Sequence, residues 1–153
     1  MSYLTGLAAP AKGDCLFCSL PLQPDEDALI VFRGATAYVV LNRFPYTNGH
    51  LMVVPFAHRA DLSGMAPEER REMIELGARA ESALREEYHP HGLNLGLNIG
   101  RSAGAGIADH AHLHVVPRWD GDTNFLTVAS GSRTVPEELP VTRRRLAARF
   151  ASA

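Results

Sequence analysis

Three of the seven histidines stand at alternate positions in one short stretch, at His110, His112 and His114. The residues between and after them are apolar and partly β-branched, a pattern typical of a β-strand. We therefore predict a strand over 109–119 whose three imidazoles share one face, because successive side chains of a strand point to opposite faces. A row of imidazoles packs poorly as a core, so this stretch is the first candidate for a functional site.

Two chemistries suit imidazoles in this arrangement. Neighbouring rings can converge on a single metal ion. Alternatively, a neutral imidazole can attack phosphorus, provided that its other nitrogen donates a proton to a fixed acceptor that sets the tautomer. The phosphoryl oxygens then need preorganised donors. The spacing does not choose between these chemistries, and a third interpretation is that the three histidines merely occupy a solvent-facing strand.

The only two cysteines, Cys15 and Cys18, are separated by two residues. This spacing suits a pair of zinc ligands or a redox pair. A redox pair normally opens a helix after a strand, whereas here Pro21 follows almost at once. Two thiolates supply only half of the four ligands that structural zinc requires. Zinc binding, redox chemistry and inert thiols all remain open at this point.

Apolar runs elsewhere in the chain predict the strands that position these residues. They lie over 28–32, 37–41, 50–55 and 93–99, and a short turn joins the first two as a hairpin. The loop 42–49 is rich in turn-forming residues and carries two aromatic side chains.

Two helices are predicted. The first begins at Pro67, a residue suited to the first helical position, and continues to about Tyr88. A second, short helix is expected over 142–150. The apolar face of the long helix contains Met73, Ile74, Gly77, Ala80 and Leu84. Together the elements predict an α+β fold, with an antiparallel sheet of about five strands, one long helix and a short C-terminal helix.

Two further histidines flank the third predicted strand. His50 opens it and His58 lies just past its end, and each alone is expected to be structural or at the surface. A glycine-rich loop over 100–106 directly precedes the three alternating histidines. Glycines let backbone N–H groups approach an anion. A plain connection would look similar, but the position of the loop favours phosphate binding.

The composition is that of one globular domain, with 153 residues, 46% hydrophobic residues and a net charge of −2. We expect a single domain over 1–153, with 1–12 as a loose tail. The charge gives no reason to expect a nucleic-acid or membrane surface. No apolar run approaches the roughly 20 residues needed to span a bilayer. The N-terminus lacks the pattern of a signal peptide, so a cytoplasmic location is expected.

The stretch His110–Val116 alternates histidine and apolar residues as H-φ-H-φ-H-φ-φ, and it resembles the histidine triad (HIT) superfamily. The resemblance covers roughly 15–125. It includes the paired cysteines, the strand pair, the histidines beside the third strand, the long helix, and Asn98 before the glycine-rich loop. The tail 117–125 resembles the branch of diadenosine tetraphosphate phosphorylases.

The resemblance implies a role for each catalytic histidine. His112 corresponds to the residue that attacks the α-phosphate of a nucleotide and forms a nucleotidyl-histidine intermediate. His114 corresponds to the residue that hydrogen-bonds phosphate oxygens and helps the leaving group. His50 corresponds to a fourth histidine that supports the triad.

The resemblance also implies contacts with the substrate. Asn98 and the backbone at Gly104 and Gly106 would hold phosphates. Asn42 and its loop would lie near the ribose and base, and Trp119 would lie near the bound nucleotide.

Several members of the superfamily bind a structural zinc ion, and here the corresponding ligands are Cys15, Cys18, His58 and His110. The opposing interpretation is that His110 only hydrogen-bonds a main-chain carbonyl and positions its strand. Mg²⁺ on the polyphosphate is compatible with the sequence but is not required by it.

The chain departs from the family just before the triad. Many relatives carry glutamine and then serine or threonine where this chain has Gly106 and Ile107. Transition-state hydrogen bonds must then come from backbone N–H groups, from Ser102 or from the second substrate, which favours inorganic phosphate over water as acceptor.

The expected function is therefore phosphorolysis of diadenosine tetraphosphate to ATP and ADP by at least a homodimer. The alternatives are a hydrolase of dinucleoside polyphosphates or nucleoside phosphoramidates, and a non-catalytic nucleotide-binding module.

Overall fold

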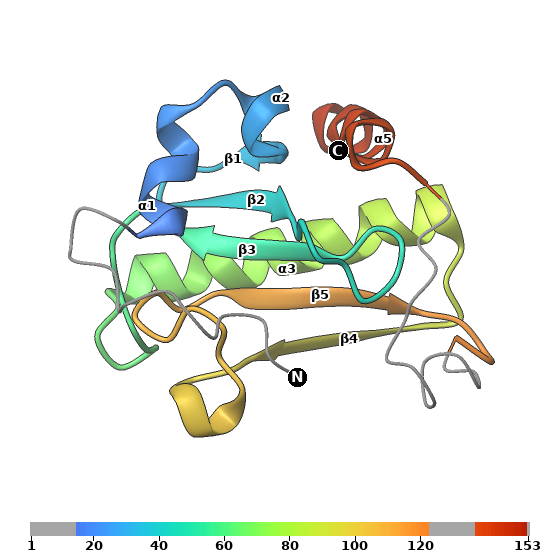
Figure 1. Cartoon of the computed structure of the whole chain (residues 1–153). Helices are drawn as coiled ribbons and strands as arrows, with labels where there is room; N and C mark the ends of the chain where they lie inside the picture. Colours follow the sequence, from blue (N-terminus) through green and yellow to red (C-terminus); the bar gives the residue numbers. More distant parts are fainter. Residues whose placement is uncertain (1–14, 123–136, 153) are drawn as a thin grey trace.

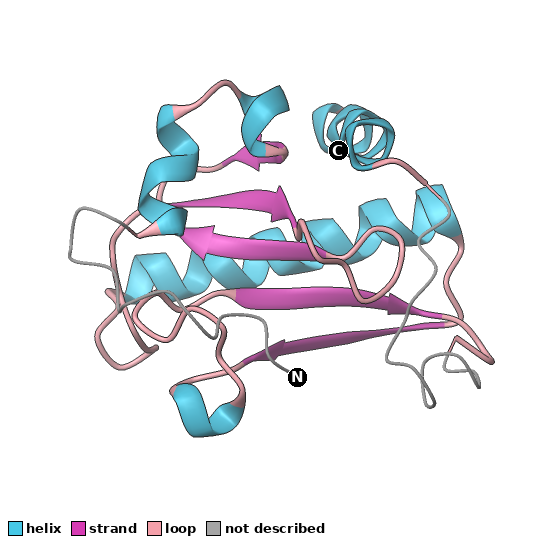
Figure 2. Ribbon diagram, in the orientation of Figure 1, coloured by secondary structure: helices cyan, strands magenta, loops and turns pink. Residues whose placement is uncertain are grey.

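The computed structural model of the chain describes residues 15–122 and 137–152. Five strands form one antiparallel sheet in the order β1-β2-β3-β5-β4 (Figures 1 and 2). This confirms the predicted α+β class. The expected tail 1–12 and the residues 123–125 lie outside the described part. The strands are β1 Ile30–Arg33, β2 Ala37–Leu41, β3 Leu51–Pro55, β4 Gly92–Leu97 and β5 Leu113–Arg118.

The long helix α3, Pro67–Tyr88, covers one face of the sheet (Figure 1). Gly77 allows a close approach, because a Cβ there would lie 3.0 Å from the Leu113 side chain of β5. The predicted helix is confirmed, but Ile74 is 60% exposed and does not belong to its buried face. A helix turns by about 100° per residue, so Ile74 points away from the row formed by Met73 and Gly77.

The chain covers the β1 edge of the sheet with shorter helices. Helices α1 Leu16–Ser19, η1 Leu20–Leu22 and α2 Asp25–Ala28 precede β1, and α5 Leu139–Ala151 packs beside it. In α5, Phe150 stacks on Phe32 of β1 at 5.4 Å between ring centroids. No helix in the described ranges is long and apolar enough to cross a membrane.

The strand predicted over 109–119 is shorter than expected. Strand β5 begins only at Leu113, which is paired with Val53 of β3 and with Leu97 of β4; β4 ends there, whereas β3 continues to Pro55 paired with β2 alone. Before this point Ala111 donates its N–H to the carbonyl of Arg59 at 2.6 Å instead of to a neighbouring strand. The prediction that all three histidines lie in a strand was therefore wrong for His110 and His112, although the rings of His112 and His114 still lie 4.8 Å apart between centroids.

Strand β5 presents His114 on the face of the sheet opposite α3. Directly paired residues share a face, and His114 is paired with Met52 on β3 and with Gly96 on β4. Leu113 and its partners face the helix. The histidine site is therefore built where β5 begins.

Candidate active site and metal-binding cluster

The structure gathers the five histidines predicted to be functional at the start of β5. Their rings form two groups of contacts. His58 and His110 lie 5.1 Å apart between ring centroids. His112 and His114 lie 4.8 Å apart, and His114 and His50 lie 5.1 Å apart. One group can therefore serve a metal ion while the other serves a reaction.

The ring of His112 is buried and its tautomer is fixed. Its Nδ1 lies 2.9 Å from the carbonyl oxygen of His110, and because a carbonyl can only accept, Nδ1 carries the proton. Burial lowers the pKa of His112 below its ordinary value, so the ring is neutral at pH 7. The lone pair is consequently on Nε2, as required of a nucleophile.

A second chain of hydrogen bonds fixes His50 and His114. The backbone N–H of Tyr46 donates to Nδ1 of His50 at 3.1 Å. In the neutral ring Nε2 of His50 therefore carries the proton and donates it to Nδ1 of His114 at 2.9 Å. Burial, with a smaller effect from the charge of His112, lowers the pKa of His114 to about 4. A neutral His114 then presents Nε2–H as a donor for a phosphate oxygen.

The loop 42–49 supports His50. Asn42 places its Nδ2 3.4 Å from Nδ1 of His50 and accepts a hydrogen bond from the N–H of Phe44 at 2.9 Å. Asn42 therefore helps to position His50, and its expected place near ribose stays a prediction. Tyr46 covers His50 at 4.6 Å between ring centroids. Sequence reasoning assigned no role to Tyr46, although it noted two aromatic residues in this loop.

Open space surrounds the glycines expected to meet phosphate. A Cβ built at Gly96, Gly104 or Gly106 would meet no heavy atom within 4 Å outside its own neighbours. Gly104 adopts φ 89°, which favours glycine, after the single turn η2 Arg101–Ala103. Gly96 is paired with His114 and was missed by sequence reasoning, although a glycine inside a strand often marks a close approach. Asn98 lies just after β4, half-buried.

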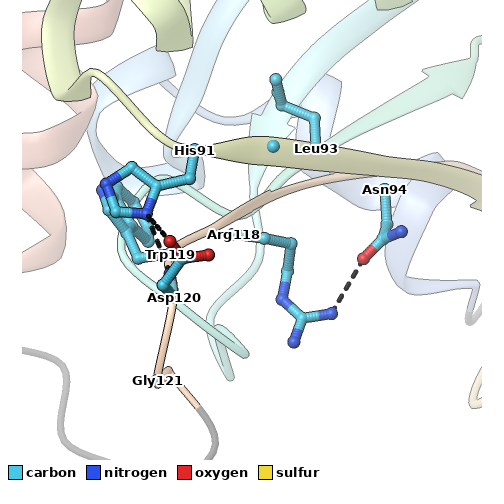
Figure 3. A pocket seen from close by; sticks show the side chains of 8 residues that line it. His91, Leu93, Asn94, Arg118, Trp119, Asp120 and Gly121 are labelled. Carbon is cyan, nitrogen blue, oxygen red and sulfur yellow. Dashed lines mark hydrogen bonds and ion pairs between the residues drawn. The ribbon is translucent and has the colours of Figure 1, made fainter.

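Trp119 lies at the other end of β5 from His112. It follows the last strand residue, about 16 Å from His114 at the usual rise per residue. There it lines a pocket of about 490 Å³ together with His91, Asn94 and Arg118 (Figure 3). The structure does not bring Trp119 to the candidate catalytic rings, so its expected place near the bound nucleotide stays a prediction.

The four predicted metal ligands meet in space. The ligand atoms of Cys15, Cys18, His58 and His110 all lie within 4.8 Å of one another. The Sγ atom of Cys15 is 3.4 Å from Nδ1 of His110, and that of Cys18 is 3.3 Å from Nδ1 of His58 and 3.6 Å from Nδ1 of His110. Tetrahedral zinc separates a sulfur and a nitrogen ligand by about 3.6 Å. The residues therefore fit a zinc ion.

The protonation of this cluster also suits a metal ion. The Nε2 atom of His110 lies 2.9 Å from the carbonyl of Pro55 and so carries the proton, which leaves the lone pair of Nδ1 facing the thiols. The sequence left open that His110 only hydrogen-bonds a main-chain carbonyl. The structure contains that hydrogen bond, and it is compatible with metal binding through Nδ1. Burial, together with the neighbouring Cys15, raises the pKa of the Cys18 thiol. Metal binding would displace that proton.

The chain is similar to proteins of one family. The model of the HIT domain matches residues 23–121. The AP-4-A phosphorylase of Mycobacterium tuberculosis is 43% identical over 159 aligned positions, which cover 99% of this chain and 80% of that protein.

Solved structures agree with this match. A Zn-bound histidine triad family protein of Mycobacterium smegmatis superposes with a TM-score of 0.73 at 30% identity, covering 93% of this chain and 96% of that one. The diadenosine triphosphate hydrolase of Plasmodium falciparum shares the fold, with a TM-score of 0.61 at 14% identity over 81% of this chain and 75% of that one. From its sequence and its fold alike, the chain belongs to the HIT domain family.

Proposed function

We propose that this protein is a nucleotidyltransferase that splits diadenosine tetraphosphate with inorganic phosphate into ATP and ADP. The observation that carries the proposal is the tautomer of His112, whose Nδ1–H bond to His110 leaves a neutral Nε2 lone pair beside the donor His114. The 43% identity to a protein named AP-4-A phosphorylase supports the substrate.

The reaction proceeds in two displacements. Nε2 of His112 attacks the α-phosphorus, the bond from that phosphorus to the bridging oxygen breaks, and ATP leaves. A phosphate oxygen then attacks the adenylyl group on His112, and ADP is released as the ring regains its lone pair. His114 donates a hydrogen bond from Nε2 to a phosphate oxygen in both steps, and His50 holds it in that tautomer.

Phosphate is proposed as the acceptor because two positions just before the triad carry no polar side chain that would position a water molecule. Gly106 and Ile107 occupy the positions where many relatives have polar side chains. Backbone N–H groups of the loop, with Asn98, are proposed to bind the phosphates instead.

We also propose that Cys15, Cys18, His58 and His110 hold a structural zinc ion, because their donor set and spacing fit it and a structural neighbour is described as Zn-bound. The ion would fix the segment that leads into the triad.

We further propose a homodimer. Strand β4 pairs with β5 alone among the described strands, so one of its edges is open, and Leu95 on β4 and Ile74 on α3 are 45% and 60% exposed. An open edge with apolar neighbours favours association with a second copy. Light scattering of the purified protein should give twice the mass of the chain, and a monomer at micromolar concentration contradicts the dimer.

Product analysis with diadenosine tetraphosphate, with and without inorganic phosphate, tests the proposed reaction. The proposal predicts ATP plus ADP only when phosphate is present, and no product from His112→Ala. AMP plus ATP without phosphate would instead show a hydrolase. Binding of nucleotide without turnover, retained in His112→Ala, would show a binding module.

A further inference from the structure

The side chain of Phe17 joins the metal-binding cluster to the catalytic histidine. Phe17 lies on α1 between the two cysteines and is only 3% exposed. Its ring centroid lies 4.8 Å from that of His112 at an interplanar angle of 51°, and 5.5 Å from that of His110 at 73°. Neither the sequence motif nor the proposed reaction assigns a role to this ring.

The orientation of the His112 ring depends on its packing. One hydrogen bond, from Nδ1 to the carbonyl of His110, fixes the tautomer and holds a single atom of the ring. The tilt of the ring about that bond is set by packing, and two aromatic rings of the described residues pack on it: Phe17 and the edge-on ring of His114. His114 is also proposed to contact the substrate. Phe17 has no such role, so its ring can hold the His112 ring in one orientation.

Phe17 is itself held in place from two directions. Its carbonyl oxygen accepts a hydrogen bond from the hydroxyl of Tyr38 at 2.7 Å, and Tyr38 lies fully buried on β2. Its chain neighbours on either side include Cys15 and Cys18, whose thiols belong to the metal-binding cluster. A side chain held in this way has little freedom to move, and it therefore restricts the movement of the His112 ring that it contacts.

We propose that Phe17 is a positioning residue that holds the imidazole of His112 in the orientation in which Nε2 attacks phosphorus. The proposal rests on the proposed function for its kinetic consequence, because the attack is the step that the orientation serves. Phe17 makes no hydrogen bond to the reacting groups and acts through His112 alone. A displacement of about 1 Å at a reacting atom can lower a rate about 100-fold.

The test compares Phe17→Leu with the same substitution at Phe150. Phe150 is equally buried, at 3% exposure, but it packs on Phe32 and Arg79 beside α5 instead of on a histidine. Both variants should lower the melting temperature similarly. Only Phe17→Leu should lower kcat for diadenosine tetraphosphate, by about 10- to 100-fold, with KM within twofold of wild type and metal content unchanged.

A substrate-free readout separates this proposal from the proposed function. In wild type the Nδ1–H proton of His112, bonded to the carbonyl of His110, should give a protected downfield proton resonance. This signal should broaden through solvent exchange in Phe17→Leu and persist in Phe150→Leu. Tyr38→Phe, which removes only the hydroxyl that anchors Phe17, should change the signal in the same direction to a smaller extent.

Four results would overturn the proposal. They are a wild-type kcat in Phe17→Leu, a raised KM with unchanged kcat, a loss of metal that parallels the loss of kcat, or an unchanged His112 resonance. Absence of any phosphorolysis by wild type would refute the proposed function, and the resonance would then decide the role of Phe17 by itself.

Discussion

The carbonyl oxygen of His110 accepts the Nδ1–H of His112 at 2.9 Å, while the side chain of His110 faces the two thiols. One residue thus contributes its ring to the candidate metal site and its main chain to the candidate nucleophile. Fixing the first residue of the triad therefore also fixes the tautomer of the second.

Replacement of His50 by leucine removes the donor that holds His114 in its Nε2–H tautomer. His114 is then free to present a lone pair to phosphate, so we expect kcat to fall by about 10- to 100-fold, while the nucleotide still binds. Steady-state kinetics measures this. His89→Asn is the control, because His89 is exposed at the end of α3 and asparagine tolerates its left-handed backbone. A kcat for His50→Leu within twofold of wild type would show that the hydrogen bond from His50 to His114 does not serve the reaction.

Substitution of Cys18 by serine should release the metal ion. We expect about one zinc ion per chain in wild type and much less in Cys18→Ser, with a lower melting temperature. An ion bound only by the folded chain stabilises it by about 4 kcal/mol when its free concentration is about 1,000 times its Kd. Elemental analysis and thermal unfolding check both effects, with Ser19→Ala as control. A metal content that is negligible in wild type contradicts the zinc site.

Acidification should destabilise the protein through His114. Its pKa in the folded chain is about 4, whereas an unperturbed histidine titrates near a pKa of about 6.5. As the pH falls below about 6.5 the unfolded chain binds the proton first, so the free energy of unfolding decreases and stops changing below about pH 4. At pH 5 the loss from this residue is about 2 kcal/mol relative to pH 8.

Urea unfolding of wild type and of His114→Gln at both pH values isolates this contribution, because all other groups titrate in both proteins. The decrease between pH 8 and pH 5 should be smaller in the variant. Equal decreases would show that His114 does not titrate as the structure indicates.

Glu72 of α3 anchors the turn between β1 and β2. Its carboxylate accepts hydrogen bonds from the N–H groups of Ala35 and Ala37 at 2.8 and 3.0 Å, and from the N–H and hydroxyl of Thr36. Burial alone would raise the pKa of Glu72, but these bonds outweigh it and hold the pKa below its usual range. Glu72→Gln should cost about 2 kcal/mol in the free energy of unfolding, with kcat unchanged.

The matched control for this substitution is Glu75→Gln on the exposed side of the same helix. Chemical denaturation should show no change there beyond about 0.5 kcal/mol. If Glu72→Gln leaves the free energy of unfolding unchanged, an amide can replace the carboxylate at this turn, which contradicts the prediction.

Hydrophobic patterning was sufficient for the sheet and for α3, because period-two and helical spacings report directly on which faces are buried. It failed at His110 and His112. The alternating pattern continues through them, but their pairing with β3 and β4 does not, and a sequence does not show at which residue the pairing of two strands ends. Between these two histidines, Ala111 bonds instead to Arg59 in the loop after β3, a contact that the sequence pattern does not indicate.

The four candidate metal ligands were predictable only in part from their spacing. Spacing within the sequence indicated Cys15 and Cys18, but only the family resemblance pointed to His58 and His110, and the structure brings all four together. Phe17 had no sequence signal beyond its place between the cysteines, since a buried aromatic residue next to a histidine looks like any other core residue.

The proposed reaction depends most on His112 as the nucleophile. Intact mass spectrometry of protein quenched after mixing with diadenosine tetraphosphate, without phosphate, tests this directly. We predict an adduct of one adenylyl group, located on His112 by peptide mapping, absent from His112→Asn and converted to ADP on addition of phosphate. An adduct on another residue, or turnover that persists in His112→Asn, would contradict the account.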